Sequence, residues 1–495
     1  MIITPDQLKS TLELKFKVMC FVDLAEINQS VSTIYKIFKD YHKEKFDPTD
    51  RLVFYSNHIP SIQLIDHICL AADIIDISRC FIMICCPDMS INNTAGIEYF
   101  QTVVTAQPLL TDNIAISSSM CPLPWMHLAV MNLGEVKPCC VSNDVIGCIP
   151  DQKLTEIFNN AEMLALRDSL SAGKKPPGCS SCWELESQNL ESYRQWHLRQ
   201  YKKQLYSGWV NDPVIRSIDF RPSNICNFKC RICSPSASSL LAAEQLSLTH
   251  DVNKITKLKN INLKGKWFDQ NTQFIDQILD LLPSLENIDF YGGEPFLLKQ
   301  LPVFLKKAIS TNHSSHIRLH FNTNGSIFPT ELIPYFQKFK QVDISVSIDN
   351  IQERFEVERG GVWSKIERNI ELFKNEPTVN FNVSIMPTIN IQNVLYLDQL
   401  IAWADNAGHR IIFNYLKGPE YLNIDFMTDL AKKLVVKKYQ NHSCLELQKI
   451  SNRVKRSPGS SGKEFIKYMQ NLDQHRKQSF LNSHNEIAIA MGYSV

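Results

Sequence analysis

Three cysteines lie close together in the segment SNICNFKCRICSPSASS, residues 223–239, where Cys226, Cys230 and Cys233 form a C-x3-C-x2-C array. Thiolates are ligands for iron–sulfur clusters and for zinc. Three thiolates bind three irons of a cubane [4Fe–4S] cluster and leave the fourth iron open. A closed electron carrier and a structural zinc site each need a fourth ligand, and no fourth cysteine follows nearby. The array therefore favours an open [4Fe–4S] cluster over a zinc site.

The array resembles the signature of radical SAM enzymes, in which the open iron chelates the amino and carboxylate groups of S-adenosylmethionine. Phe228 occupies the aromatic position of that signature. Downstream, LENIDFYGGEP at 285–295 is a short alternating strand that ends in Gly-Gly-Glu-Pro. Glycines let the backbone approach a ligand closely. The resemblance assigns this motif to the methionyl amino group of the cofactor, through Gly292, Gly293, Glu294 and Pro295.

Two later strands also end in polar motifs. HIRLHFNTNGS at 316–326 ends in Thr-Asn-Gly, and VDISVSID at 342–349 ends in Ser-x-Asp, before a segment that resembles the family's Arg-Gly turn and helix. Active-site residues of a β/α barrel lie at the carboxyl ends of its parallel strands. Each motif alone is typical of a turn, but their order after the cysteines is that of the family. The resemblance implies that Ser347 and Arg359 contact the ribose or carboxylate of the cofactor. The full set of cofactor contacts that it implies from these motifs is Thr323, Asn324, Ser347, Asp349 and Arg359.

Strands and helices alternate through the part of the chain that carries these motifs. Helical patterns such as 272–285 and 301–311 separate the strands. This predicts an α/β fold, and the number of strands matches the partial (β/α)6 barrel of radical SAM enzymes rather than a full eightfold barrel. The predicted strands are 215–222, 287–293, 317–324, 343–349, 379–386 and 410–416.

A second group of cysteines precedes the first. Gly134 predicts a hairpin turn that brings Cys121 close to Cys139, and a C-x2-C pair adds Cys179 and Cys182. The group resembles the auxiliary-cluster unit of SPASM and twitch domains, although in most relatives that unit follows the barrel. This resemblance implies one auxiliary [4Fe–4S] cluster on these four thiolates.

Two alternatives remain open for this second group. Four thiolates would satisfy zinc equally well. Cys140 could also replace Cys139, although adjacent side chains point to opposite sides of an extended strand.

The chain divides into four predicted parts. Residues 1–112 alternate strands at 16–23, 51–57 and 80–86 with helices at 28–44 and 62–76, which indicates a small α/β domain with a parallel sheet. No glycine-rich phosphate loop follows its first strand, so we expect recognition of a substrate or partner. The other parts are a twitch-like domain at 113–205, the partial barrel at 206–425 and a helical extension at 426–495.

Composition excludes several partners. The chain has 52 Lys and Arg against 51 Asp and Glu among 495 residues, so its net charge offers no attraction to nucleic acid or to an anionic membrane. The beginning of the sequence lacks a signal pattern, and the most apolar run, 80–86, is too short to span a membrane. We expect a cytoplasmic protein, in which the 15 cysteines serve as ligands or as buried side chains rather than disulfides.

The predicted function follows from the cofactors. One electron from a donor such as flavodoxin or ferredoxin would cleave S-adenosylmethionine, and the resulting 5′-deoxyadenosyl radical would abstract hydrogen from a substrate. Peptides are common substrates in the families that the chain resembles, so peptide modification is favoured over a small metabolite such as a sugar or nucleoside. Epimerisation would need a thiol hydrogen donor, for which the candidates are Cys444 and Cys148. A non-catalytic iron–sulfur scaffold or electron carrier is the alternative from another class.

Overall fold

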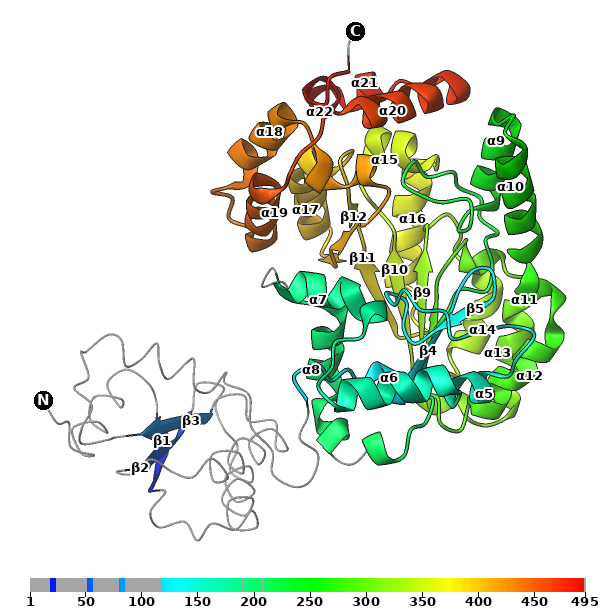
Figure 1. Ribbon diagram of the computed structural model, residues 1–495, viewed down its shortest axis with the longest axis vertical. Helices are drawn as coiled ribbons and strands as arrows, with labels where there is room; N and C mark the ends of the chain where they lie inside the picture. The colour runs from blue at the N-terminus through cyan, green and yellow to red at the C-terminus, as the bar shows by residue number, and fades with distance from the viewer. Residues whose placement is uncertain are drawn as a thin grey trace, which may run out of the picture. The chain divides into compact units, whose positions relative to one another are not determined.

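The computed structural model describes residues 18–23, 51–56, 80–84, 117–187, 191–206 and 209–493. The chain forms two compact units, Met1–Ser117 and Ser118–Val495 (Figure 1). In the first unit, strands β1 (Val18–Asp23), β2 (Arg51–Ser56) and β3 (Cys80–Ile84) form a parallel sheet in that order. These strands confirm the predicted parallel sheet, whereas the two predicted helices lie outside the described residues.

The second unit is built on a nine-stranded sheet with the order β13-β11-β10-β9-β8-β7-β4-β5-β6. All neighbours from β13 to β4 pair in parallel, which confirms the α/β fold with its parallel sheet. The parallel strands are β4 (His127–Val130), β7 (Ser217–Phe220), β8 (Asn287–Phe290), β9 (Arg318–Thr323), β10 (Gln341–Val346), β11 (Phe381–Ile385) and β13 (Arg410–Ile411).

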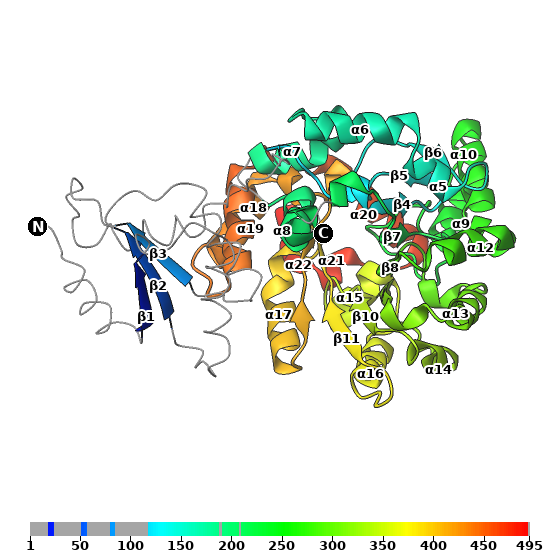
Figure 2. The same ribbon diagram turned by 90° about the horizontal axis from the view of Figure 1, so that it is seen from below.

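Helices cover the outer face of this curved sheet (Figure 2). The core lies between these layers, where Phe220 of β7 contacts Phe268 edge to face and stacks on Phe274, with ring centroids 5.0 and 5.3 Å apart. Side chains alternate along a strand, so the polar residues that alternate with these apolar residues face the inner side of the sheet. The helices are α9 (Ser239–Leu248), α10 (Val252–Lys264), α11 (Trp267–Gln270), α12 (Thr272–Leu281), α13 (Leu301–Ser310), α14 (Ile333–Phe336), α15 (Gln352–Arg359), α16 (Trp363–Lys374) and α17 (Leu397–Asn406).

The segment that carries the second cysteine group joins the same sheet. Strands β4 and β5 (Glu135–Lys137) form the predicted hairpin, with Gly134 at φ +91°, and β6 (Gly147–Cys148) extends it. The sequence did not predict that β4 would pair in parallel with β7. A parallel pair needs a long crossover, which is supplied here by helices α5 (Leu154–Phe158), α6 (Ala161–Ser171), α7 (Ser180–Ser187) and α8 (Tyr193–Tyr206).

The last predicted strand of the barrel is broken. Instead of one strand over 410–416, the chain forms β13 in the main sheet and β14 (Asn414–Tyr415), which pairs with β12 (Thr388–Ile389) in a separate two-stranded sheet. Pro387 lies between β11 and β12 and has no backbone N–H to donate to a ladder. The neighbouring strand is interrupted opposite this gap, between β13 and β14.

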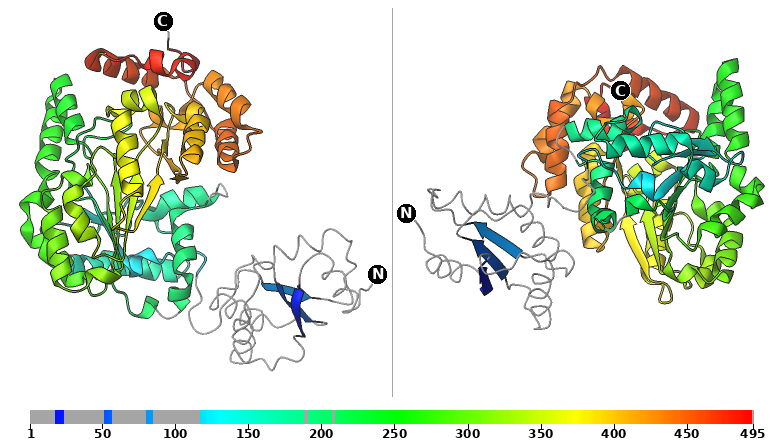
Figure 3. Two further views of the ribbon diagram at one scale, coloured as in Figure 1. Left: turned by 180° about the vertical axis from the view of Figure 1, so that it is seen from behind. Right: turned by 60° about the horizontal axis from the view of Figure 1, so that its bottom comes forward.

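The C-terminal part is helical. Its last three helices lie at the same end of the barrel as α15 (Figure 1), and Figure 3 shows them, in red, from behind. The domain boundaries given above remain predictions. No helix among the described residues has the length and apolar character needed to cross a bilayer. The C-terminal helices are α18 (Asp429–Tyr439), α19 (Leu445–Arg456), α20 (Lys463–Arg476), α21 (Phe480–Ser483) and α22 (Asn485–Ala490).

Candidate active site

The loop with the first three cysteines connects β7 to α9, at the carboxyl end of β7. Burial raises the pKa of Cys226 to about 12, and the Cys230 thiol contributes to that rise. Burial likewise raises the pKa of Cys233 to about 12, with contributions from both other thiols. The three sulfurs are therefore electrostatic neighbours that hold their protons at neutral pH, and a bound metal would have to displace those protons.

The serine run after the cysteines shapes this loop. The Ser238 hydroxyl accepts a hydrogen bond from the N–H of Leu241 at 3.2 Å, so it caps the start of α9. The same hydroxyl donates to the carbonyl of Phe228 at 2.7 Å. Ser239 accepts from the N–H of Cys226 at 3.4 Å. Short hydroxyl side chains thus tie the loop between the cysteines to the first turn of the following helix.

Glu294 brings two of the predicted motifs together. Its carboxylate accepts hydrogen bonds from the Thr323 hydroxyl at 2.7 Å and from the Asn324 N–H at 2.8 Å. The residue is fully buried, and burial raises its pKa to about 7 against the opposing effect of these hydrogen bonds. The Gly-Gly-Glu-Pro motif and the Thr-Asn-Gly motif therefore form one unit at the carboxyl ends of β8 and β9.

Asn324 connects this unit to the cysteine loop. Its amide nitrogen donates to the side-chain oxygen of Asn227 at 2.8 Å and lies 3.9 Å from the sulfur of Cys226. Asn227 in turn donates to the Ser326 hydroxyl at 2.8 Å. The backbone adds a further contact, since the N–H of Glu294 donates to the carbonyl of Ile225 at 2.7 Å.

The third predicted motif reaches the same place through α15. Arg359, the last residue of this helix, forms an ion pair of 2.5 Å with Asp349. Its backbone carbonyl lies 3.7 Å from the Cys230 sulfur. Among the described residues, the Arg359 Nε is buried without a hydrogen-bond partner. Ser347 directly follows β10, and its hydroxyl donates to the side-chain oxygen of Asn322 at 3.1 Å. A buried guanidinium nitrogen that lacks a partner fits a polar or anionic ligand.

The four cysteines of the second group are also electrostatic neighbours. Burial raises the pKa of Cys121 well above its ordinary value, and the nearby thiols of Cys139, Cys179 and Cys182 raise it further. Burial raises the pKa of Cys139 to about 12 and that of Cys179 to about 11. The two loops meet where the Asn143 N–H donates to the carbonyl of Gly178 at 2.9 Å. Four thiols from three segments thus share one region.

In neither cysteine group are the side chains arranged around a common metal position. Among the residues that the structure describes, no three Cys, His, Asp or Glu side chains are arranged to hold one metal ion. Both groups still supply the soft thiol donors that iron–sulfur clusters take as ligands. The donor sets fit a three-thiolate and a four-thiolate cluster.

Comparison with known families agrees with both cysteine groups. Residues 220–403 match the radical SAM superfamily, and residues 121–183 match an iron–sulfur cluster-binding domain, SPASM. The chain therefore contains a radical SAM domain and a SPASM-type iron–sulfur domain. Domains of these two kinds bind a [4Fe–4S] cluster with S-adenosylmethionine and auxiliary iron–sulfur clusters, respectively. The superfamily match favours an enzyme over the electron carrier that the cysteines alone left open.

Solved structures of low similarity were also found. The anSMEcpe structure with bound AdoMet and Cp18Cys peptide is 18% identical, with a TM-score of 0.31 over 45% of this chain and 56% of that chain. SuiB of Streptococcus suis is 13% identical, with a TM-score of 0.29 over 56% of this chain and 57% of that chain. The aligned region thus spans little more than half of either relative, and no residue of the site is assigned from these structures.

Cys140 has different neighbours from those of Cys139. Burial raises the pKa of Cys140 well above its ordinary value, and the nearby Asp219 carboxylate raises it further. The Tyr193 side chain forms a hydrogen bond to the Cys140 thiol. Asp219 belongs to β7 and Tyr193 to α8, whereas the thiols of Cys179 and Cys182 act on Cys139 and Cys139 acts on Cys121. These surroundings favour Cys139 over Cys140 as the fourth ligand. The extended strand that the sequence suggested ends at Lys137, and the two cysteines lie in the bend and turn that follow.

Sequence reasoning missed a polar chain on the inner face of the barrel. His320 hydrogen-bonds to Asp289 at 3.1 Å and to the Ser345 hydroxyl at 2.9 Å, and Ser345 hydrogen-bonds to Ser384 at 3.0 Å. The chain crosses four adjacent strands, from β8 to β11. The signal in the sequence was the polar residue at every second position of these strands. Such a chain fixes the orientation of the His320 ring on the inner face.

The two predicted hydrogen-donor thiols lie apart from these motifs. Cys444 precedes α19 and lines a cavity of about 570 Å³ with residues of α17 and β13, none of which belongs to the predicted cofactor site. Cys148 lies on β6, where the charged groups that affect its pKa are Asp151, Glu135 and Lys264. The structure brings neither thiol to the cysteine loop.

Proposed function

We propose that this enzyme cleaves S-adenosylmethionine reductively at an open [4Fe–4S] cluster bound by Cys226, Cys230 and Cys233, and abstracts hydrogen from a substrate. One observation carries the proposal. The cysteine loop contacts Asn324 of the Glu294 unit and the carbonyl of Arg359, so four motifs that are separated in sequence meet at one end of the barrel.

The chain's own residues have distinct tasks in this proposal. When bound, the cluster supplies the electron that splits the sulfonium into methionine and a 5′-deoxyadenosyl radical. The Glu294 carboxylate holds the methionyl ammonium, and the Gly292–Gly293 backbone lets that group approach closely. Arg359 has a free Nε for the carboxylate or ribose. Burial of both charged groups strengthens their interactions with the ligand because water is excluded.

We propose a second [4Fe–4S] cluster at Cys121, Cys139, Cys179 and Cys182, where zinc is the alternative. This cluster would accept or relay an electron during substrate oxidation. A flavodoxin or ferredoxin would reduce the open cluster. The proposed compartment is the cytoplasm, whose reducing conditions keep the thiols available as ligands.

A peptide is the proposed substrate, on the basis of the match to the SPASM domain. A sugar or nucleoside is the runner-up. The first unit, whose first strand is followed in the sequence by no glycine-rich phosphate loop, is proposed to recognise the substrate or a partner.

The test is anaerobic reconstitution with iron and sulfide, followed by measurement of 5′-deoxyadenosine formed from S-adenosylmethionine with dithionite. We expect 5′-deoxyadenosine from the wild type and none from the Cys226→Ala, Cys230→Ala, Cys233→Ala triple variant. Metal analysis of the same samples separates iron from zinc. A wild type that carries iron at the triad and makes no 5′-deoxyadenosine would refute the proposed function.

A further inference from the structure

The loop that carries the first three cysteines is held by the C-terminal helices as well as by the barrel. Arg231 lies between Cys230 and Cys233, and its side chain is fully buried. Its guanidinium donates to Asp473 of α20 at 2.6 Å and to Gln478 at 3.0 Å. No sequence motif pointed to this contact, since the two charged partners are 242 residues apart.

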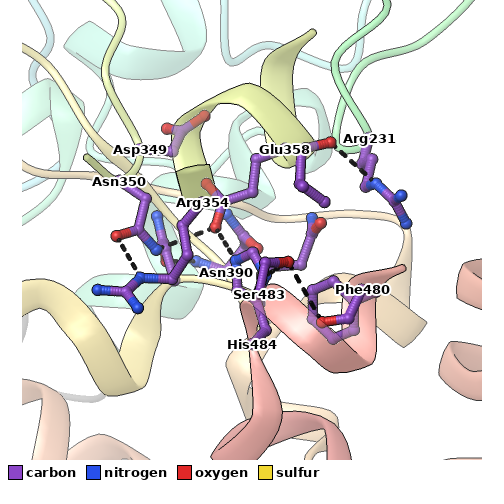
Figure 4. A network of polar contacts seen from close by, with 12 residues as sticks. Arg231, Asp349, Asn350, Arg354, Glu358, Asn390, Phe480, Ser483 and His484 are labelled. Carbon is purple, nitrogen blue, oxygen red and sulfur yellow. Dashed lines mark hydrogen bonds and ion pairs between the residues drawn. The ribbon is translucent and has the colours of Figure 1, made fainter. Parts of the chain in front are cut away.

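The same guanidinium also reaches α15. The side-chain Nε of Arg231 donates to the carbonyl of Val357 at 3.0 Å. The backbone N–H of Arg231 donates to the carbonyl of Glu358 at 2.7 Å. Figure 4 shows Arg231 beside the end of this helix. The next residue of the helix is Arg359. One buried side chain therefore ties together the cysteine loop, the C-terminal helices and the helix that presents Arg359.

A second contact holds the other side of the loop. Lys229 donates to Glu244 of α9 at 2.8 Å, and Arg476 of α20 donates to the same carboxylate at 2.6 and 3.1 Å. The Glu244 side chain is almost completely buried. The two basic residues that flank Cys230 thus each contact a carboxylate linked to α20. Arg231 binds Asp473 of α20 itself, and Lys229 binds Glu244 of α9, which also binds Arg476 of α20.

A third contact holds α15 directly. His484, which lies between α21 and α22, hydrogen-bonds to Glu358 at 2.8 Å and to Ser483 at 2.8 Å (Figure 4). Both His484 and Glu358 are buried, and His484 stacks on Phe480 with ring centroids 4.4 Å apart. The C-terminal helices therefore contact each of the two segments that form the cofactor end of the barrel.

Charge makes these contacts specific. Asp473 is fixed within its own segment, because its other oxygen accepts from the Phe480 N–H at 2.8 Å and from the Tyr493 hydroxyl at 2.7 Å. A buried ion pair contributes little to stability compared with apolar packing, but it fixes geometry because removing one partner leaves an uncompensated charge. Arg231 thus has one defined position, and this position constrains Cys230 and Cys233, which are its neighbours on either side.

We propose that Asp473 and His484 are positioning residues, which hold Arg231 and Glu358 so that the three thiols and Arg359 keep the spacing that the open cluster and S-adenosylmethionine require. This inference rests on the proposed function. It assigns to the C-terminal helices a part in retaining the cluster, in addition to packing.

The test compares Asp473→Asn and His484→Gln with wild type after anaerobic reconstitution. Asp276→Asn is the matched control, since Asp276 forms a 2.8 Å ion pair with Lys307 on the exposed outer side of the barrel. We measure iron per chain, the rate of iron release to a chelator, the affinity for S-adenosylmethionine and the thermal midpoint. We expect Asp473→Asn to release the open-cluster iron at least about tenfold faster than wild type. His484→Gln should weaken cofactor affinity by about tenfold with less loss of iron.

A double variant, Arg231→Met with Asp473→Leu, separates positioning from the cost of a buried charge. It leaves no unpaired charge, so its thermal midpoint should fall less than that of Asp473→Asn, and it should still lose the open-cluster iron faster than wild type. Wild-type iron retention in this double variant or in Asp473→Asn would overturn the inference. Parallel loss of both clusters would also overturn it, since that result indicates general unfolding. If the wild type itself binds no iron at the triad, the proposed function fails, and this inference fails with it.

Discussion

Glu294 is the residue through which we propose to test cofactor binding most directly. It is buried, it joins two motifs through Thr323 and Asn324, and no cysteine ligand is lost when it is changed. For Glu294→Gln we expect S-adenosylmethionine to bind about 10- to 100-fold more weakly, because a charge-assisted hydrogen bond is replaced by a neutral one. Equilibrium dialysis measures this affinity, and iron per chain should match that of wild type. Unchanged affinity would show that Glu294 does not contact the cofactor.

Cys139 and its neighbour Cys140 differ in their surroundings. Cys139 is near the thiols of Cys179 and Cys182, whereas Cys140 is near Asp219 and Tyr193. We therefore expect Cys139→Ser to lose the auxiliary iron and Cys140→Ser to retain it. Iron and zinc analysis of both variants measures the effect, and each variant is the control for the other. The opposite pattern would make Cys140 the ligand.

Glu358 gives the enzyme a defined pH dependence. Burial, with a smaller contribution from Asp349, raises the pKa of Glu358 to about 8. The unfolded glutamate loses its proton near pH ~4.3, so above that value the folded protein holds the extra proton and stability falls as pH rises. Burial lowers the pKa of His484, which has the opposite effect below about pH 6.5. The groups that face this pair are Asp349, Asn350, Glu353, Arg354, Arg359, Arg231 and Asp473.

The net result is a loss of stability between about pH 6.5 and 8 in wild type. Glu358→Gln imitates the protonated side chain, so its stability should change less over this interval. The thermal midpoints of wild type and variant, measured at several pH values, should therefore diverge in favour of the variant as pH rises. Parallel curves would show that Glu358 is ionised in the folded protein at neutral pH.

At the scale of elements, the turn after β8 must approach the cysteine loop closely. Gly293 has φ +59°, and a Cβ built on it would lie 2.3 Å from the carbonyl oxygen of Ile225. Gly293→Ala should therefore displace the loop and reduce open-cluster iron by more than about half. Gly408→Ala is the matched control, because Gly408 has φ +66° and no neighbouring atom within 4 Å of its Cβ position.

The control should cost about 1 kcal/mol of stability from backbone strain alone. It should keep its iron, because Gly408 lies in the connection between α17 and β13. Iron per chain and thermal unfolding of both variants measure the difference. Equal iron loss in the two variants would attribute the effect to strain rather than to contact with the cysteine loop.

Across the whole molecule, the sequence predicted what depends on local pattern. The cysteine spacings, the motifs at strand ends and the hairpin at Gly134 all lie within short segments, and the strands near them were found. Pairing over long distances carries no local signal. Nothing near His127 or Ser217 indicates that β4 and β7 are neighbours, and nothing near Arg231 indicates Asp473. The break at Pro387 could have been read from its missing N–H, but the resulting break in the neighbouring strand could not.

The central claim concerns the molecule as a whole, since we propose that the thiolates of one loop bind the open cluster and that three other motifs hold its S-adenosylmethionine. Electron paramagnetic resonance of the dithionite-reduced protein tests it most directly. Spectra are recorded with and without S-adenosylmethionine, and the Cys226→Ala, Cys230→Ala, Cys233→Ala variant supplies the signal of the auxiliary site for subtraction. The account predicts a reduced [4Fe–4S] signal that is absent from the variant and that shifts when S-adenosylmethionine is added. A signal that the cofactor leaves unchanged would contradict it.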